Sequence, residues 1–418
     1  MDEGGDRALN PARPVRVMLL LESLHGGGAE RVAVALANGC DPDRIDVQIA
    51  LLRPTGPYLA EVDPQRLVVA PLTSRLVTYD GPTSGFYRLD RMLTAATLPL
   101  LDIAATVRRQ RPDVLISFCK GMNLAAFGAL PLAGGARPVW IAREGNNIGQ
   151  MLDIELGRRP LRSLVEGLTH ACYRSADCCL ANAKGLAEML AVQSGVDGDK
   201  LRVIPNPIDL ARIRRLACEP LADPPARPFV ISAGRLEHQK GHDLLIQAFA
   251  AAPACASLDL VILGRGQMET ALRRLASELG VADRVHFPGF VANPWSWLAK
   301  ARLFVLPSRF EGFPTALAEA LACGCPALAT DCDYGPGEMV AHGQNGWLAP
   351  VDDMPALAAA MQDILSNPEA AAMVAARGRA SVERLDLPHI VGAYSRLFVE
   401  QALARSPTAV AELQLAAP

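Results

Sequence analysis

The sequence predicts an α/β protein made of two tandem doubly wound domains that face each other across a cleft. The chain has 418 residues, enough for two or three domains with cores of their own. Short apolar runs alternate with helical stretches, a pattern typical of parallel sheets covered by helices on both faces. A proline-rich stretch interrupts this alternation once, and the same alternation then starts again.

Seven strands are expected in the first half of the chain. Strands of a parallel sheet are buried on both faces, so they read as continuous apolar runs such as VMLLL and DVLISF. The expected strands are Val15–Leu21, Asp46–Leu52, Leu67–Ala70, Asp113–Phe118, Pro138–Arg143, Asp177–Ala181 and Leu201–Ile204. Helices are expected between them, at Ala29–Asn38, Leu93–Gln110 and Leu186–Ser194 among others.

Residues 216–228 are predicted to be a linker between the two domains. The segment Glu219–Pro228 has four prolines in ten positions, and neither a helix nor a central strand tolerates so many. The domains are therefore expected at residues 1–215 and 229–385. Residues 386–418 are expected to form a terminal helix and a tail, and whether the helix packs back on the first domain is left open.

The second half repeats the same rhythm of strands and helices, and it becomes mostly helical from Met354 onward. The expected strands are Phe229–Ala233, Asp259–Leu263, Arg284–Phe287, Leu303–Pro307, Pro326–Thr330 and Gly346–Ala349. The expected helices are Leu244–Ala250, Met268–Leu279, Trp295–Ala301 and Thr315–Cys323.

The composition argues against several classes of protein. Half of the residues are hydrophobic and a fifth are charged, as in ordinary globular chains, which argues against disorder. The net charge is −3, whereas a dedicated nucleic-acid binder carries a basic field. No apolar run reaches the roughly 20 residues that a membrane span needs, and no signal peptide is visible. We therefore expect a cytoplasmic protein that binds no nucleic acid.

The ten cysteines show no C-x-x-C pair, so reduced and mostly buried thiols are expected. Cys323, Cys325 and Cys332 are near enough in sequence to consider a metal site, but their spacing fits no zinc pattern. We favour core packing for them. Asp331 and Asp333 have the spacing of a D-x-D motif and are interpreted as a polar turn. No metal and no bound cofactor is expected.

The first candidate site is the loop that follows the strand Phe229–Ala233. Arg235 and Lys240 lie five positions apart in this loop, between Gly234 and Gly241. An arginine offers a planar fork to phosphate oxygens and a lysine a compact point charge, so the pair suits one anionic group. Taken alone, two basic residues in a polar loop are more simply explained as solvated.

The second candidate site is the segment Ser308–Glu319, after the strand Leu303–Pro307. Pro314 fits the first turn of a helix, and the free amides of a helix start, with its macrodipole, form an anion site. Glu311 and Glu319 are both expected to approach a ligand there, because carboxylates accept hydrogen bonds from vicinal sugar hydroxyls. The expected contacts between them are Gly312, Phe313, Pro314, Thr315, Ala316 and Leu317.

Two glycine-rich loops complete the set of candidate sites. Gly264 belongs to a G-x-G that follows the strand Asp259–Leu263, a weak signal without the fuller dinucleotide fingerprint. Gly27 and Gly28 belong to a run of three glycines between the first strand and the first helix, where the backbone can approach a ligand closely. A flexible turn is the alternative interpretation for that run.

Together these segments resemble the glycosyltransferases of the GT-B fold, family four, which are retaining enzymes built of two Rossmann-like domains. The resemblance covers most of the chain. It rests on GGGAERV and VIPNPID in the first half, and on SAGRLEHQKG and FPGF in the second. The segment EGFPTALAE, with two glutamates eight positions apart, and the following ACGCP are its most specific part.

The resemblance implies a role for individual residues. Arg235 and Lys240 match the pair that holds the diphosphate of the donor. Glu311 matches the carboxylate that contacts the donor sugar, and Glu319 the one that binds the ribose. The remaining matched positions are the backbone contacts to the base, Phe290 and Val291, and the glycine loop on the acceptor side, Gly27 and Gly28.

One feature departs from the family. Many relatives carry a histidine near the reacting carbon, after the strand that is here DVLISF, and this chain has none between His25 and His170. The candidates for its replacement are the loop expected at residues 119–123 and the polar run at 143–147. The choice between them stays open.

The resemblance implies transfer of a sugar from a nucleotide diphosphate, with retention, to a hydroxyl of a glycan or polyprenol-linked acceptor. Metal independence belongs to the same expectation. Uridine diphosphate is favoured as the carrier, because backbone contacts near Phe290 would suffice to bind its base. The alternatives are a GDP-mannose-dependent mannosyltransferase, a nucleotide-sugar epimerase of the same architecture, and a sugar-binding homologue without turnover.

A basic amphipathic stretch in the first half raises the question of membrane contact. Its cationic and apolar residues are Arg158, Arg159, Arg162 and Arg174 with Leu161, Leu164, Val165 and Leu168. Such a segment suits peripheral contact with anionic lipid at the inner face of the membrane. We favour the simpler interpretation, a solvated helix face with an ordinary core side.

Overall fold

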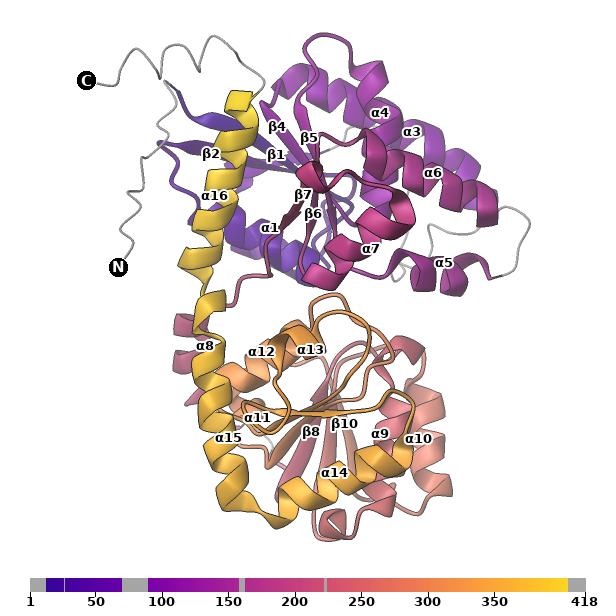
Figure 1. Cartoon of the computed structure of the whole chain (residues 1–418), viewed down its shortest axis with the longest axis vertical. Helices are drawn as coiled ribbons and strands as arrows, with labels where there is room; N and C mark the ends of the chain where they lie inside the picture. Colours follow the sequence, from indigo (N-terminus) through magenta and orange to yellow (C-terminus); the bar gives the residue numbers. More distant parts are fainter. Residues whose placement is uncertain (1–12, 26, 70–88, 158–161, 222–223, 405–418) are drawn as a thin grey trace. The chain divides into compact units, whose positions relative to one another are not determined.

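The chain folds into two compact units, each built on its own parallel sheet (Figure 1). The structure is a computed structural model that describes residues 13–25, 27–69, 89–157, 162–221 and 224–404. The first unit combines described residues up to Asn182 with Leu186–Pro207 and the residues from Pro388 onward. The second unit is formed by Ala183–Gly185 and Ile208–Leu387.

Among the described residues, the sheet of the first unit has seven parallel strands in the order β3-β2-β1-β4-β5-β6-β7. Because β1 pairs with both β2 and β4, the chain winds outward in two directions from the middle of the sheet. The carboxyl ends of β1 and β4 therefore lie at a topological switch point, where open α/β sheets bind their ligands. The strands are β1 (Val15–Leu21), β2 (Ile45–Leu51), β3 (Leu67–Val69), β4 (Val114–Phe118), β5 (Val139–Glu144), β6 (Cys178–Ala181) and β7 (Leu201–Val203).

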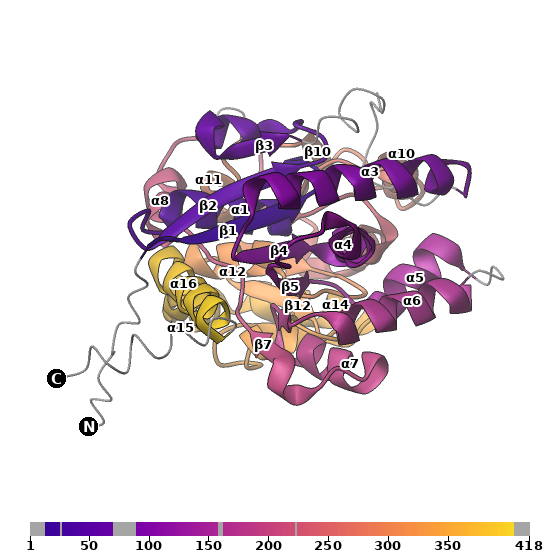
Figure 2. The ribbon, with the colours of Figure 1, turned by 90° about the horizontal axis from the view of Figure 1, so that it is seen from above.

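Helices cover this sheet, and α3 packs against α4, which in turn packs against α6 (Figures 1 and 2). The last helix, α16, lies against the end of α1, where Val391 packs on Gly39 and Ser395 Oγ is 3.7 Å from Cys40 Sγ. The helices are α1 (Gly28–Gly39), α3 (Leu89–Gln110), α4 (Cys119–Ala133), α5 (Ile148–Leu156), α6 (Arg162–Ser175), α7 (Lys184–Ser194) and α16 (Leu387–Ala404), with short 3-10 turns η1 (Pro57–Glu61), η2 (Pro64–Arg66) and η4 (Gly198–Lys200).

In the part of the second unit that the structure describes, a parallel sheet has six strands in the order β10-β9-β8-β11-β12-β13. The chain again starts in the middle, so β8 is the neighbour of both β9 and β11. The strands are β8 (Phe229–Ala233), β9 (Asp259–Leu263), β10 (Val285–Gly289), β11 (Leu303–Leu306), β12 (Ala327–Thr330) and β13 (Trp347–Ala349).

Alternate side chains of these strands enter two separate apolar layers. Val230, Leu260 and Val305 face the layer that contains α9, α10 and α14. Phe304 and Leu306 face the opposite layer, which contains α8, α11 and α12. The helices are α8 (Leu210–Ala217), α9 (His242–Ala251), α10 (Glu269–Glu278), α11 (Trp295–Leu298), α12 (Thr315–Ala322), α13 (Pro336–Met339), α14 (Met354–Ser366) and α15 (Pro368–Ser381), with the 3-10 turns η5 (His238–Lys240), η6 (Pro253–Cys255) and η7 (Glu383–Leu385).

The two doubly wound domains of the expected fold class are confirmed, and each expected strand exists within two residues of its expected bounds. The largest local difference concerns the loop expected at residues 119–123, which is the first turn of α4. Asn123 and Ala126 are fully buried on this helix, and burial of that face outweighs Gly121 and Pro131, which disfavour helix locally. Several expected positions lie outside the described residues: Ala70, Arg158, Arg159, Leu161 and the part of the expected terminal helix and tail from residue 405 onward.

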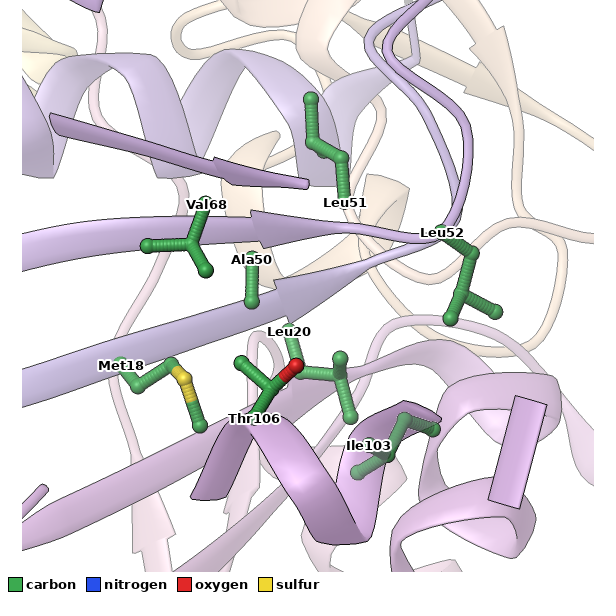
Figure 3. Close-up of a pocket in the computed structure, with 8 residues that line it drawn as sticks. All are labelled: Met18, Leu20, Ala50, Leu51, Leu52, Val68, Ile103 and Thr106. Atoms are coloured by element: carbon green, nitrogen blue, oxygen red, sulfur yellow. The ribbon is translucent and has the colours of Figure 1, made fainter. Parts of the chain in front are cut away.

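Within the described part of the chain, no helix is both long and apolar enough to cross a membrane. A small cavity of about 10 Å³ lies in the first unit, between the ends of β1 and β2 and the helix α3 (Figure 3). Its lining is apolar apart from Thr106, and its volume is far below that of a ligand pocket. It is therefore a packing gap rather than a binding site.

A buried hydrogen bond adds to the apolar contacts that hold α16 on the first unit. Arg143 at the end of β5 is 1% exposed, and its Nε donates to Tyr394 Oη of α16 at 2.9 Å. We expect Tyr394→Phe to destabilise the first unit by about 2 kcal/mol, because it leaves a buried guanidinium N–H without an acceptor.

Hydrogen exchange of β4 and β5 measures this effect. Tyr58→Phe is the matched control, since Tyr58 accepts a hydrogen bond from Arg31, whose side chain reaches solvent. Equal loss of protection in the two variants would contradict the expectation.

Candidate active site

The candidate site of the second unit is built from two loops at the carboxyl ends of neighbouring strands. One loop follows β8 and contains η5, and the other follows β11 and leads into α12. Because β8 and β11 are hydrogen-bonded neighbours, their following loops meet at one edge of the sheet. Gly241 makes this meeting possible, because it has φ +62° and a Cβ there would lie 2.0 Å from the carbonyl oxygen of Pro307.

An ion pair joins the two loops. Lys240 Nζ lies 2.5 Å from Glu311 Oε1, and the two side chains are only 17% and 5% exposed. Ser308 Oγ donates to the same carboxylate oxygen at 2.6 Å. A buried carboxylate needs such partners because desolvation strongly disfavours an isolated charge. The structure thus places one cation and one anion together at the edge where a ligand would arrive.

Arg235 occupies the outer part of the same loop. Its side chain is 55% exposed, with Nη1 3.1 Å from Glu237 Oε2 and Nη2 donating to Gln239 Oε1 at 3.4 Å. An exposed pair of this kind contributes at most about 1 kcal/mol, so a more highly charged ligand can replace it. Arg235 is therefore accessible to an anion, whereas Lys240 is already engaged by Glu311.

The G-x-G after β9 packs against the loop that follows β8. Gly264 has φ +132°, and a Cβ at this position would lie 1.9 Å from the carbonyl oxygen of Gly234. Leu236 N–H donates to the carbonyl oxygen of Arg265 at 3.0 Å. The observed reason for glycine at residue 264 is thus close packing of two backbone segments.

The start of α12 differs from the expectation that the amides of the helix start, those of Thr315, Ala316 and Leu317, are free. Thr315 N–H donates to the carbonyl of Phe313 at 2.9 Å, and Leu317 N–H donates to that of Pro314 at 2.9 Å. Within the described residues, Ala316 N–H alone of the three has no such acceptor. Pro314 lies at the N-cap rather than in the first turn, because the helix begins at Thr315. The expectation was therefore wrong for two of the three amides.

The remaining expected contacts lie around these loops. Gly312 is buried beside Glu311, whereas Phe313 is half-buried against the layer that contains α12. Glu319 is half-buried in the second turn of α12. Phe290 is 57% exposed directly after β10, and Val291 packs partly into the core.

Gly27 and Gly28 belong to the first unit. Gly27 is the N-cap of α1 and Gly28 is its first residue, so the glycine run ends where a helix starts. The Glu30 carboxylate lies over Gly27, where it would be 2.4 Å from a Cβ. The third glycine of the run, Gly26, lies outside the described residues.

The candidates for the missing histidine have different environments in the first unit. Arg143 is fully buried, with Nη2 donating to Asn206 Oδ1 at 2.5 Å. Glu144 is 2% exposed and accepts hydrogen bonds from Tyr173 Oη and from the amides of Gly145 and Asn146. Burial raises the pKa of Glu144, although these hydrogen bonds and nearby Lys120 oppose that rise.

These contacts tie Arg143 and Glu144 into the fold of the first unit. Cys119 is exposed at the carboxyl end of β4, with φ +67°, a backbone conformation that non-glycine residues seldom adopt. Lys120 is 6% exposed in the next position. Each candidate segment thus combines buried and accessible positions, the accessible ones being Cys119 and Gly121 in the first and Gly145 and Asn146 in the second.

Sequence reasoning assigned no role to several residues that shape the site. Ser308 holds the Glu311 carboxylate, Gln239 Nε2 donates to the carbonyl of Phe310 at 3.0 Å, and Arg309 pairs with Asp243 at 2.8 Å. Ser308, Gln239 and Arg309 lie inside the two candidate segments. Each is a polar residue close to a catalytic candidate, and this position in the sequence could have indicated that it shapes the site.

The cysteines near this site are thiols with little exposure to solvent. Burial raises the pKa of Cys323 and of Cys332 to about 12. Among the residues that the structure describes, no cluster of three or more His, Cys, Asp or Glu side chains is arranged to hold a metal ion.

His242 makes the stability of the second unit depend on pH. It is 2% exposed at the start of α9, and burial lowers its pKa to about 3, with a further contribution from Lys240 that outweighs Asp243. Below pH 6.5 the unfolded chain binds a proton that the folded chain does not. We expect the second unit to lose about 2 kcal/mol from this histidine between pH 6.5 and pH 5.

His242→Phe should remove this part of the acid loss, measured as the thermal midpoint of the second unit at both pH values. His342→Phe, which replaces an exposed histidine of the same unit, should retain the loss. An unchanged pH dependence in His242→Phe would contradict the interpretation.

Two family models match the chain. Residues 26–212 match the model described as Glycosyltransferase Family 4, and residues 218–381 match the one described as Glycosyl transferases group 1. The second match contains both loops of the candidate site.

Three relatives show how far the similarity extends. An N-acetylgalactosamine-N,N'-diacetylbacillosaminyl-diphospho-undecaprenol 4-alpha-N-acetylgalactosaminyltransferase of Campylobacter jejuni is 38% identical over 43% of this chain and 48% of its own, so the match spans about half of that protein. The lipopolysaccharide core biosynthesis glycosyltransferase LpsE of Rhizobium meliloti is 28% identical over 88% of this chain and 92% of its own. A GDP-mannose-dependent alpha-(1-6)-phosphatidylinositol monomannoside mannosyltransferase of Mycolicibacterium smegmatis is 31% identical over 70% of this chain and 78% of its own.

Two solved structures share the fold. A sucrose-phosphate synthase from Thermosynechococcus elongatus has a TM-score of 0.75 at 21% identity, covering 94% of this chain and 100% of that one. Anabaena HepE in complex with UDP and glucose has a TM-score of 0.72 at 20% identity, covering 92% and 100%. The chain therefore belongs to the group 1 glycosyltransferases of family 4, which have the GT-B fold.

Proposed function

We propose that this glycosyltransferase moves a sugar, with retention, from a nucleoside-diphosphate donor to a hydroxyl of a glycan or polyprenol-linked acceptor. The observation that supports it most is the meeting of Lys240 and Glu311, with Arg235 exposed on the same loop. A cation and a carboxylate at one sheet edge suit a ligand that is both a phosphate and a sugar.

The diphosphate leaving group gives the two cations their role. As the bond between the sugar carbon and the phosphate oxygen breaks, negative charge develops on that oxygen. Arg235 and Lys240 stabilise this charge, and the proposal requires no metal ion for it. The acceptor oxygen forms the new bond to the sugar carbon, and its proton passes to the departing phosphate oxygen.

The carboxylates bind hydroxyl groups of the donor. Glu311 is already fixed by Lys240 and Ser308, so its second oxygen is held in a defined position for the donor sugar. Glu319, in the second turn of α12, accepts hydrogen bonds from the ribose hydroxyls. The base lies against the backbone at Phe290 and Val291, directly after β10.

We favour uridine diphosphate as the carrier. The solved Anabaena protein of the same fold binds UDP, which agrees with this choice without deciding it. GDP-mannose is the second candidate for the donor, because the mannosyltransferase relative depends on it. A thermal-shift panel of UDP, GDP, UDP-sugars and GDP-mannose distinguishes the two carriers, since a ligand at 100 times its dissociation constant stabilises by about 2.7 kcal/mol.

Lys240→Met and Glu311→Gln are each expected to lower transfer by a factor of about 100 or more, because each removes a group that acts on the leaving group or the sugar. The measurement is the formation of glycosylated acceptor from the donor that the thermal-shift panel identifies.

Lys300→Met is the matched control, because Lys300 belongs to the same unit and donates to the backbone carbonyls of Glu219 and Ser296. It should keep the turnover of the unaltered chain. Near-normal turnover in Lys240→Met or Glu311→Gln, with the fold intact by circular dichroism, would refute the proposed site.

A polyprenol-linked acceptor would be met at a membrane surface, so the proposal includes peripheral contact with anionic lipid. This replaces the preference for an ordinary core side, because two leucines of that stretch are exposed. Leu164 and Leu168 of α6 are 58% and 46% exposed and lie one turn apart. Arg162 and Arg174 of the same helix contact Asp153 and the carbonyl of Ser194. We expect Leu164→Ser with Leu168→Ser to reduce flotation with anionic liposomes, and equal flotation would remove this part of the proposal.

A further inference from the structure

Arg309 lies between β11 and α12, two positions before Glu311, and it touches three separate segments of the second unit. Its side chain is 15% exposed. Its guanidinium donates four hydrogen bonds, to the Asp243 carboxylate, the Asp352 carboxylate and the carbonyl of His238. These bonds occupy four of its five N–H donors, so Arg309 is not itself free to bind a phosphate.

The first connection reaches the loop of Lys240. Arg309 Nη1 donates to the carbonyl of His238 at 2.7 Å, and Arg309 N–H donates to the carbonyl of Gln239 at 2.8 Å. Gln239 Nε2 returns a hydrogen bond to the carbonyl of Phe310 at 3.0 Å. Three hydrogen bonds therefore hold the residues directly before Lys240 against those directly before Glu311.

The second connection reaches the first turn of α9. Arg309 Nη1 and Nη2 donate to the two oxygens of Asp243 at 2.9 and 2.8 Å, a bidentate geometry that fixes orientation as well as distance. Burial alone would raise the pKa of Asp243, but the hydrogen bonds and the charge of Arg309, together with the backbone amides of Asp243 and Leu244, outweigh burial and the pKa is lowered. The start of α9, which follows Lys240 and Gly241, is thus held to the same guanidinium.

The third connection reaches the turn between β13 and α14. Arg309 Nε donates to Asp352 Oδ1 at 2.8 Å. Asp352 has φ +54°, and its side chain is 56% exposed. An ion pair with an exposed carboxylate contributes little to stability by itself. The connections to Asp243 and to the Lys240 loop are therefore the important ones.

We propose that Arg309 is a positioning residue that sets the geometry of the Lys240–Glu311 pair and thereby the affinity for the nucleoside diphosphate. The inference rests on the proposed function, because it assigns Arg309 an effect on that same ligand. Arg309 acts through Lys240, which lies on the loop that it holds from both ends. A lysine in its place keeps the charge but lacks the planar fork, so it cannot hold Asp243 and the loop together.

The test compares Arg309→Met with Arg309→Lys in the full chain, and uses UDP and GDP as the probes. Both variants should raise the dissociation constant of the nucleoside diphosphate that the unaltered chain binds by about tenfold, with a parallel rise in the KM for its sugar. Asp243→Asn should show the same direction of change, and it keeps the test open if Arg309→Met does not fold.

A double variant separates positioning from general stabilisation. If Arg309 acts through Lys240, adding Arg309→Met to Lys240→Met should weaken nucleoside-diphosphate binding little beyond the loss caused by Lys240→Met alone. Fully additive losses would overturn the proposal, because they would mean that Arg309 acts by another route.

Arg284→Met is the matched structural control. Arg284 is also half-buried, donates to the carbonyls of Cys255 and Leu258 at 2.7 and 3.1 Å, and precedes β10 at the opposite edge of the sheet. It should lower the thermal midpoint and leave the dissociation constant unchanged. If Arg309→Met and Arg309→Lys behave in this same way, the inference is overturned. If the unaltered chain binds neither UDP nor GDP, the proposed function fails together with the inference.

Discussion

The candidate site depends on the compensation of one buried charge. Glu311 lies in a loop that is almost closed to solvent, and a carboxylate there is tolerated only with a cation and hydrogen-bond donors beside it. Lys240 and Ser308 supply them. Because Lys240 is 71 positions away in the chain, its loop has to be held in place by contacts of its own. Gly241, Gly264 and the hydrogen bonds of Arg309 are those contacts.

The parallel sheet explains why these contacts gather at one edge. In each unit the chain starts in the middle of the sheet and winds outward in both directions, so loops from two halves of the unit emerge side by side. In the second unit these are the loops after β8 and β11. The alternation of side chains into two apolar layers fixes the strands themselves, which leaves the loops free to vary in chemistry.

The first unit uses its buried polar groups in another way. Arg143 and Glu144 come from the end of β5, yet their hydrogen bonds run to Tyr394, Asn206 and Tyr173 within the unit. These residues stabilise the packing of helices and strands, and α16 is one of the elements that they hold. The polarity of Arg143 and Glu144, which belong to a segment considered as a replacement for the missing histidine, is satisfied by partners inside the fold.

The sequence by itself determined the fold class, the strands and the two loop segments of the candidate site, 234–241 and 308–319. It could do so because apolar periodicity and turn residues act over a few neighbouring positions. It failed at α4, where burial of one face outweighs local glycine and proline, and at the amides of Thr315 and Leu317, whose acceptors depend on the turn that precedes the helix. Only the tertiary structure decided that Lys240 meets Glu311 and that Arg309 joins the loops around them. Those meetings follow from which strands are neighbours, and strand order is a property of the packed sheet rather than of any local stretch of chain.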